Sequence, residues 1–144
     1  MRILLTLVLL SAALAAAQTT PPGKPQDALA LAVRSQAVLD EYVIGAMEPD
    51  AMKYAQRLRL TRAALDGQRQ QWPTVRSGAD PWNSYSACKN ALEKASEVAG
   101  LSATKAVSTR DNKVFQVEKT RLQQLRTECK RQISIGTSSA AVQK

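Results

Sequence analysis

The sequence predicts an all-α protein: a small antiparallel four-helix bundle that follows a cleaved signal peptide and has its third and fourth helices joined by a disulfide. Three observations support this fold class. Alanine, leucine, glutamine and arginine dominate the chain after its leader, and all four favour helices. Apolar residues recur at helical spacing, without the alternation typical of strands. Glycine and proline fall where helix ends are expected.

The first 17 residues have the pattern of a secretory signal peptide. Arg2 gives a positive start, residues 3–17 form an apolar run, and Ala15–Ala17 offer a small-residue cleavage site before Gln18. The run is shorter than the roughly 20 residues of a membrane-spanning helix. No cysteine lies near the cleavage site, which disfavours a bacterial lipid anchor. We therefore expect a periplasmic or secreted mature protein without a transmembrane segment.

We expect four segments along the chain. The signal peptide at 1–17 is followed by an extended, proline-rich leader at 18–26, a helical bundle domain at 27–135 and a flexible C-terminal tail at 136–144. Cleavage leaves 127 residues, which is enough for one domain with a modest core. The mature chain then holds 19 basic and 12 acidic residues, a net charge of +7.

Two helices are expected in the first half of the domain. The first runs from about Asp27 to Met47, and Pro49 suits the first turn of the second, which extends to about Trp72. Gly67 weakens this second helix near its end. The first helix places Leu31, Ser35, Val38, Tyr42 and Gly45 on one face, and the second places Ala51, Tyr54, Leu58, Thr61, Leu65 and Trp72 on one face.

Two further helices are expected in the second half. Asp80 as N-cap and Pro81 at the first helical position mark a strong start for the third helix. The stretch Ser108–Asp111 has the spacing of a capping box and opens a fourth helix, which ends at about residue 135. The third helix presents Trp82, Tyr85, Cys88, Leu92, Ala95 and Ala99 on one face, and the fourth presents Phe115, Leu122, Leu125, Cys129 and Ile133.

The two cysteines, Cys88 and Cys129, are expected to form a disulfide. In an antiparallel helical hairpin, the sequence numbers of any two facing residues add up to the same value. The register that pairs the two cysteines also brings small residues of one helix opposite large residues of the other. This register requires the third helix to continue through Gly100 to about Ala106. Export favours oxidation, and two unpaired buried thiols are the alternative. Closing a loop of 41 residues should stabilise the fold by about 4 kcal/mol.

The residue types present exclude several kinds of chemistry. The chain has no histidine, so histidine triads, cysteine–histidine dyads and histidine metal sites are absent, and two cysteines cannot form a four-thiolate zinc site. Glu93 and Glu97 lie one turn apart beside lysines, as on a solvated face. A second acidic group surrounds the junction of the first two helices: Asp40, Glu41, Glu48 and Asp50. We therefore expect no enzyme, no metal and no cofactor.

A row of arginines is the main candidate for binding a partner. Arg59, Arg62 and Arg69 line one side of the second helix, with Asp66 among them. This row is either an ordinary solvated face or a binding face, because arginine makes bidentate contacts to carboxylates and phosphates. Two tryptophans flank the next connection and either close the core or act as exposed anchors. The candidate partner-binding residues are therefore Arg59, Arg62, Arg69, Trp72 and Trp82.

The leading functional hypothesis is an exported, non-catalytic protein-binding module of the bacterial envelope, of the inhibitor, immunity or adaptor type. Its basic face would meet an acidic protein surface. The alternatives are a binder of polyanions or of the envelope surface, such as anionic lipids or glycans, and a periplasmic holdase chaperone. Nucleic acid is disfavoured because the cations lack interleaved aromatic residues. Leu60–Thr61 resembles the start of the L-T-x-x-Q motif of Spy-type periplasmic chaperones, but Ala64 replaces the glutamine, so no functional residue is carried over.

Overall fold

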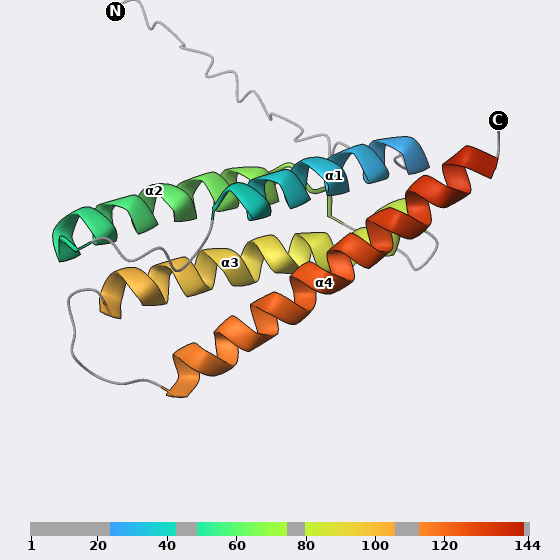
Figure 1. Ribbon diagram of the computed structural model, residues 1–144. Coiled ribbons are helices and arrows are strands. Elements are labelled where there is room, and N and C mark those ends of the chain that lie inside the picture. Colours follow the sequence, from blue (N-terminus) through green and yellow to red (C-terminus); the bar gives the residue numbers. More distant parts are fainter. Residues whose placement is uncertain (1–23, 43–48, 75–79, 106–112, 143–144) are drawn as a thin grey trace, which may run out of the picture.

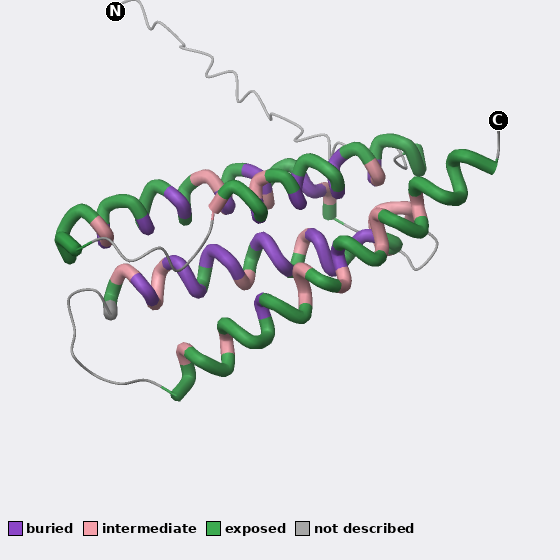
Figure 2. The backbone as a smooth tube through the Cα atoms, viewed as in Figure 1, coloured by how far each residue is buried: buried purple, intermediate pink, exposed green. Residues whose placement is uncertain are grey.

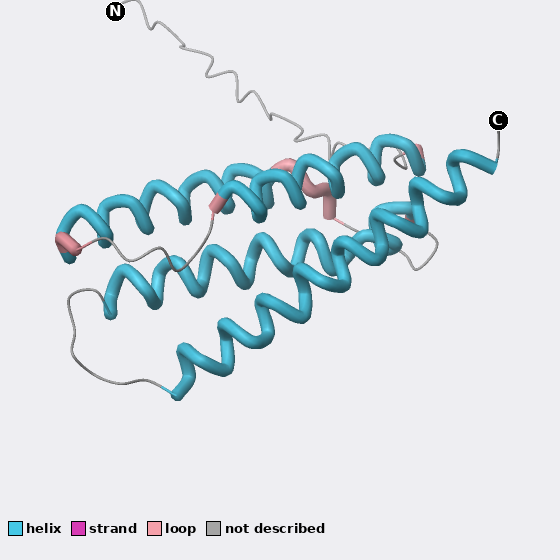
Figure 3. The backbone as a smooth tube through the Cα atoms, in the orientation of Figure 1, coloured by secondary structure: helices cyan, strands magenta, loops and turns pink. Residues whose placement is uncertain are grey.

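The chain is all-helical throughout the residues that the structure, a computed structural model, describes: 24–42, 49–74, 80–105 and 113–142. Within these ranges there are helices and connecting loops but no strand (Figure 3). The helices are α1 (Pro25–Glu41), α2 (Ala51–Gln70), the short 3-10 helix η1 (Pro81–Tyr85), α3 (Ser86–Lys105) and α4 (Lys113–Val142). The predicted all-α class is confirmed for this part of the chain.

Helix α3 lies at the centre of the bundle, and both α2 and α4 pack extensively against it (Figure 1). Buried residues follow α3 along most of its length, whereas α4 is exposed over most of its surface (Figure 2). Ala91, Leu92, Val98 and Ala99 of α3 are fully buried, and the small alanines let the neighbouring helices approach closely. Among the described residues of α4, only Leu122 and Cys129 are buried.

The predicted Cys88–Cys129 disulfide is confirmed and joins α3 to α4. The two Cα atoms lie 4.6 Å apart, and both cysteines are fully buried. Helix α3 passes through Gly100 without a break, as the expected register requires, and its described part ends at Lys105. The capping box predicted at 108–111 lies outside the described residues.

Two aspartates cap helices in this fold. The Asp80 carboxylate accepts a hydrogen bond from the Trp82 backbone N–H at 3.1 Å, which confirms the predicted N-cap. Asp50 accepts hydrogen bonds from the backbone N–H groups of Met52 and Lys53 at 2.9 and 3.1 Å. The predicted start of the second helix was therefore wrong by two residues, since Pro49 lies before the cap and not in the first turn.

Further boundaries and faces differ from the predictions. Helix α1 begins at Pro25, inside the leader that was expected to stay extended to residue 26, because proline suits the first turn of a helix. Helix α1 ends at Glu41 rather than near Met47, and the sequence continues with Val43, Ile44 and Gly45, which are poor helix formers. On α2, Ala51 is exposed, whereas Ala55 and Gln68 are buried. The third helix begins as the 3-10 turn η1 before it becomes α3.

The fourth helix does not end at residue 135, as the sequence had indicated, but continues through Gly136 to Val142. In this extension the hydroxyl groups of Thr137, Ser138 and Ser139 each donate a hydrogen bond to a backbone carbonyl one turn earlier, at 2.9 to 3.0 Å. None of the helices in the described ranges combines the length and the apolar character that a membrane crossing needs.

Candidate partner-binding site

The three candidate arginines lie on the outer side of α2, and two of them share an acid. Arg62 Nε lies 3.8 Å from the Asp66 carboxylate, and Arg69 Nε lies 3.9 Å from it. The Arg62 side chain is 58% exposed and that of Arg69 is 40% exposed. Contacts this long between exposed groups contribute little to stability, so the single carboxylate leaves both guanidinium groups able to bind another acid.

Arg59 and Arg62 line a hollow between α2 and α3, which we call the arginine hollow. It has a volume of about 360 Å³, and its walls are formed by Leu58, Arg59, Arg62, Gly100, Ala103 and Thr104. The bare backbone of Gly100 makes room for Arg62, because a Cβ atom at this position would lie 3.1 Å from Arg62 Nη1. Thr104 donates its hydroxyl to the Gly100 carbonyl at 3.1 Å. Among the residues that the structure describes, no acidic side chain forms part of these walls.

Two guanidinium groups beside an acid-free hollow can bind a carboxylate or a phosphate. Each guanidinium offers paired N–H donors in a planar fork, which matches the two oxygens of such a group. These oxygens would lie in the hollow beside Arg62, whose side chain covers Gly100, and the small side chain of Ala103 leaves this space open. The structure therefore brings Arg59 and Arg62 together, whereas Arg69 lies outside the hollow.

The two candidate tryptophans lie at the other end of α2, and one of them belongs to the core. Trp72 is only 6% exposed, and its Nε1 donates a hydrogen bond to the buried Ser35 hydroxyl at 3.0 Å. Gln68 Nε2 donates to the same oxygen at 3.3 Å. Trp82 is half-buried and packs edge-to-face on Trp72, with ring centroids 6.1 Å apart. Trp72 therefore closes the core and is not an exposed anchor. It lies about 20 Å from Arg59 along the axis of α2.

Asp40 of α1 forms ion pairs with α4. The Asp40 carboxylate accepts a hydrogen bond from Arg126 Nη2 at 2.9 Å and lies 3.4 Å from Lys130 Nζ. Partial burial raises the pKa of Asp40, but the neighbouring polar side chain of Gln36, the hydrogen bond from Arg126 and the charge of Lys130 outweigh it, so its pKa lies below the usual value.

A second ion-pair group joins α3 to α4. Lys94 pairs with Glu97 on its own helix and with Glu118 of α4, the latter at 2.6 Å. The hydrogen bond to Glu118, followed by that to Glu97, raises the pKa of Lys94. In the described ranges no three acidic or cysteine side chains come together as metal ligands would. These carboxylates therefore act as structural ion pairs in the geometry observed.

Sequence reasoning missed a second concave region, which we call the terminal cleft. It has a volume of about 590 Å³ and lies between the start of α1, η1 and the C-terminal part of α4. Its wall contains Tyr85, Arg131, Gln132 and Gly136. The hairpin register offered a signal for it, because Tyr85 lies one turn before Cys88 and faces position 132, one turn before Gly136. A glycine on one helix opposite an aromatic residue on the neighbouring helix indicates that the aromatic ring packs closely against the glycine backbone.

Comparison with known proteins gives no guide to this arrangement: no family model matches the chain, and no curated protein or solved structure is detectably similar to it.

Proposed function

We propose that this chain is an exported, antiparallel four-helix module of the bacterial envelope, without catalytic activity, that binds an acidic protein surface through Arg59 and Arg62. An inhibitor, an immunity protein or an adaptor would all use such a surface. The observation that carries the proposal is the arginine hollow: two exposed guanidinium groups flank a space that none of the described acidic residues lines. A signal peptide at 1–17 and the Cys88–Cys129 disulfide support an exported location.

The mechanism is electrostatic recognition by a surface that is already shaped. Arg62 lies against Gly100, so part of the cost of ordering its long side chain is met by the fold itself. A carboxylate from the partner would enter the hollow and accept paired hydrogen bonds from one or both guanidinium groups. The positive charge of the chain would speed the encounter with an acidic partner, and the geometry of the hollow would select its position.

The test is capture of partners from envelope extract by the oxidised mature protein, followed by affinity measurement with the purified candidate. We expect one stoichiometric protein with an acidic surface, retained when the salt concentration is raised. Replacing both hollow arginines, Arg59→Gln with Arg62→Gln, should weaken binding by at least about a hundredfold, because two charge-assisted contacts are lost.

The matched control removes the same charge elsewhere on α2. Lys53 and Arg57 are exposed cations of this helix that do not line the hollow. The double variant Lys53→Gln with Arg57→Gln should therefore bind nearly as tightly as the unmodified protein. Equal losses in the two double variants would mean that only total charge matters, and would contradict a specific site at the hollow.

The polyanion alternative makes a different prediction in the same assay. With a net charge of +7 on the mature chain, binding to anionic lipid vesicles or sulfated glycan would fall steeply as salt rises. Retention on those surfaces alone, lost at high salt and equally sensitive to both double variants, would replace the protein-binding proposal with this alternative.

A further inference from the structure

The terminal cleft lies far from the arginine hollow and has a different composition. The cleft contains residues of η1, which precedes α3, whereas the hollow contains Gly100 and Thr104 near the other end of α3. The two are about 20 Å apart along that helix. Its volume of about 590 Å³ falls inside the range of about 300–1,000 Å³ that is usual for small-molecule sites. An inference about the cleft is therefore independent of the function proposed for the hollow.

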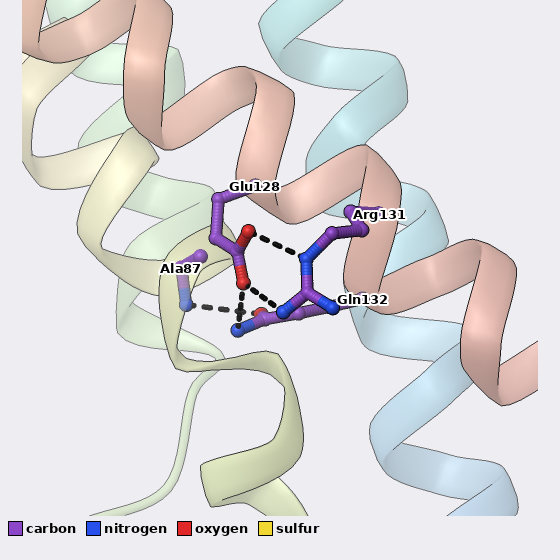
Figure 4. A network of polar contacts seen from close by, with 4 residues as sticks. All are labelled: Ala87, Glu128, Arg131 and Gln132. Carbon is purple, nitrogen blue, oxygen red and sulfur yellow. Dashed lines mark hydrogen bonds and ion pairs between the residues drawn. The ribbon is translucent and has the colours of Figure 1, made fainter.

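One wall of the cleft is held in place by a network of polar contacts (Figure 4). Gln132 Oε1 accepts a hydrogen bond from the Ala87 backbone N–H at 3.2 Å, and Gln132 Nε2 donates to the Glu128 carboxylate at 3.4 Å. Arg131 donates to the two Glu128 oxygens from Nε at 2.7 Å and from Nη2 at 2.5 Å. These bonds orient the Arg131 guanidinium, and its Nη1 takes no part in them.

The charges in this wall cancel. Arg131 is the one charged residue among the described residues that line the cleft, and its paired carboxylate, Glu128, lies directly behind it. The hydrogen bond from Arg131 keeps the pKa of Glu128 below its usual value, so the pair stays ionised and neutral overall at ordinary pH. A ligand with a net charge would gain little here, in contrast to the arginine hollow.

The remaining walls combine uncharged polar groups with apolar surface. Gln26, Asn83 and Ser84 supply amides and a hydroxyl, and Leu29 and Ile135 supply apolar surface. Tyr85 is buried beside them, and burial raises its pKa above the ordinary value, so the phenol stays neutral and able to donate a hydrogen bond. Such walls suit a ligand with many hydroxyl or amide groups around apolar ring faces.

We propose that the terminal cleft binds an uncharged saccharide, with its hydroxyl or acetamido groups on Arg131 and the neighbouring amides and its C–H faces on Leu29 and Ile135. Pairing of an extended peptide with a strand edge is not available here, because the described residues contain no strand. The cleft instead presents side-chain donors that sugar hydroxyl groups can match, and hydrogen bonds hold Arg131 and Gln132 in place among them.

The test is an NMR titration of the oxidised protein with two neutral disaccharides, N,N′-diacetylchitobiose and cellobiose. We expect at least one of them to cause saturable shifts in the backbone amides of Asn83, Ser84 and Ile135, with no effect on Gly100 or Thr104. A sulfated disaccharide and an uncharged tripeptide are titrated in parallel. Tighter binding of either one at the same amides, or no saturable shift with both neutral disaccharides, would overturn the proposal.

Two variants locate the site, and a third controls for loss of charge on α4. Arg131→Met should weaken binding by about tenfold or more, because a charge-assisted contact is lost. Ser84→Trp, at an exposed position of the wall, should block the cleft and abolish binding. Arg121→Met removes an exposed arginine elsewhere on α4 and should change affinity less than twofold. Equal effects of Arg131→Met and Arg121→Met, or unchanged binding by Ser84→Trp, would place the ligand elsewhere.

Discussion

Three glycines within helices allow the packing of this fold to be tested with a single kind of substitution. Around Gly67 no atom lies within 4 Å of the position where a Cβ would be. At Gly100 the Cβ would meet only the far end of the Arg62 side chain, at 3.1 Å. At Gly136 it would lie 2.1 Å from the Tyr85 hydroxyl oxygen and 3.0 Å from Cζ. Substitution by alanine therefore adds the same methyl group in three different surroundings. It meets open space at Gly67, a flexible side chain at Gly100 and a buried ring at Gly136.

The expected changes in the free energy of unfolding follow from these distances. Gly67→Ala should stabilise by about 0.5–1 kcal/mol, because alanine has the better helix propensity and meets nothing. Gly100→Ala should be close to neutral, since the exposed end of Arg62 can move a few tenths of an ångström. Gly136→Ala should destabilise by about 1–2 kcal/mol, because Tyr85 is only 7% exposed and its rigid ring would have to give up its present packing to clear the added methyl group.

Urea unfolding followed by far-UV circular dichroism would measure all three changes. The decisive comparison is Gly136→Ala in the Tyr85→Phe background, where the hydroxyl that causes the collision is absent. There the cost of the alanine should fall by at least about 1 kcal/mol, a coupling typical of residues in contact. A Gly136→Ala variant as stable as Gly67→Ala, or an unchanged cost in the Tyr85→Phe background, would refute the packing of α4 against η1.

Three other predictions can be checked with the same unfolding assay. Cys88→Ala should cost about 4 kcal/mol, with no further loss when Cys129 is also replaced, because either change opens the same 41-residue loop. Trp72→Phe should cost about 1–2 kcal/mol through the lost hydrogen bond to Ser35 and the smaller ring, and a neutral result would contradict its place in the core. Asp40→Asn should cost less than about 1 kcal/mol at pH 7. Because the folded-state pKa of Asp40 is lowered, its contribution is present above the ordinary value of 3.8 and is lost as pH falls through the folded-state pKa, so the difference should vanish in acid.

The sequence was a reliable guide where one strong signal decided a feature. Asp80 followed by Pro81 marked a helix start, and the observed cap has the expected hydrogen bond. The pairing of Cys88 with Cys129 also required α3 to continue through Gly100, and both features are observed. In each case a local rule and a long-range constraint favoured the same structure.

The sequence misled where tertiary contacts outweigh local propensity. Gly136 reads as a helix end, yet it lies inside α4, because a position that must accommodate Tyr85 has room for nothing larger. The terminal cleft was missed for a related reason. Its walls come from three elements far apart in the chain, and its network forms only when the Ala87 backbone meets the side chain of Gln132. The candidate arginines were identified from spacing on one helix, but spacing could not separate Arg69 from the hollow that Arg59 and Arg62 share.

The position of the disulfide gives the two candidate sites different dependence on oxidation. Among its described residues, α4 buries only Leu122 and Cys129 fully, and Phe115, Leu125 and Ile133 pack partly buried against the core. The disulfide adds a covalent link to this partly exposed packing against α3. The terminal cleft needs α4 for Arg131, Gln132 and Ile135, whereas the described residues that line the arginine hollow belong to α2 and α3. Loss of the disulfide should therefore loosen the cleft while leaving the hollow intact. A Cys88→Ala variant that keeps binding at the hollow but loses binding at the cleft would separate the two sites without changing a residue of either.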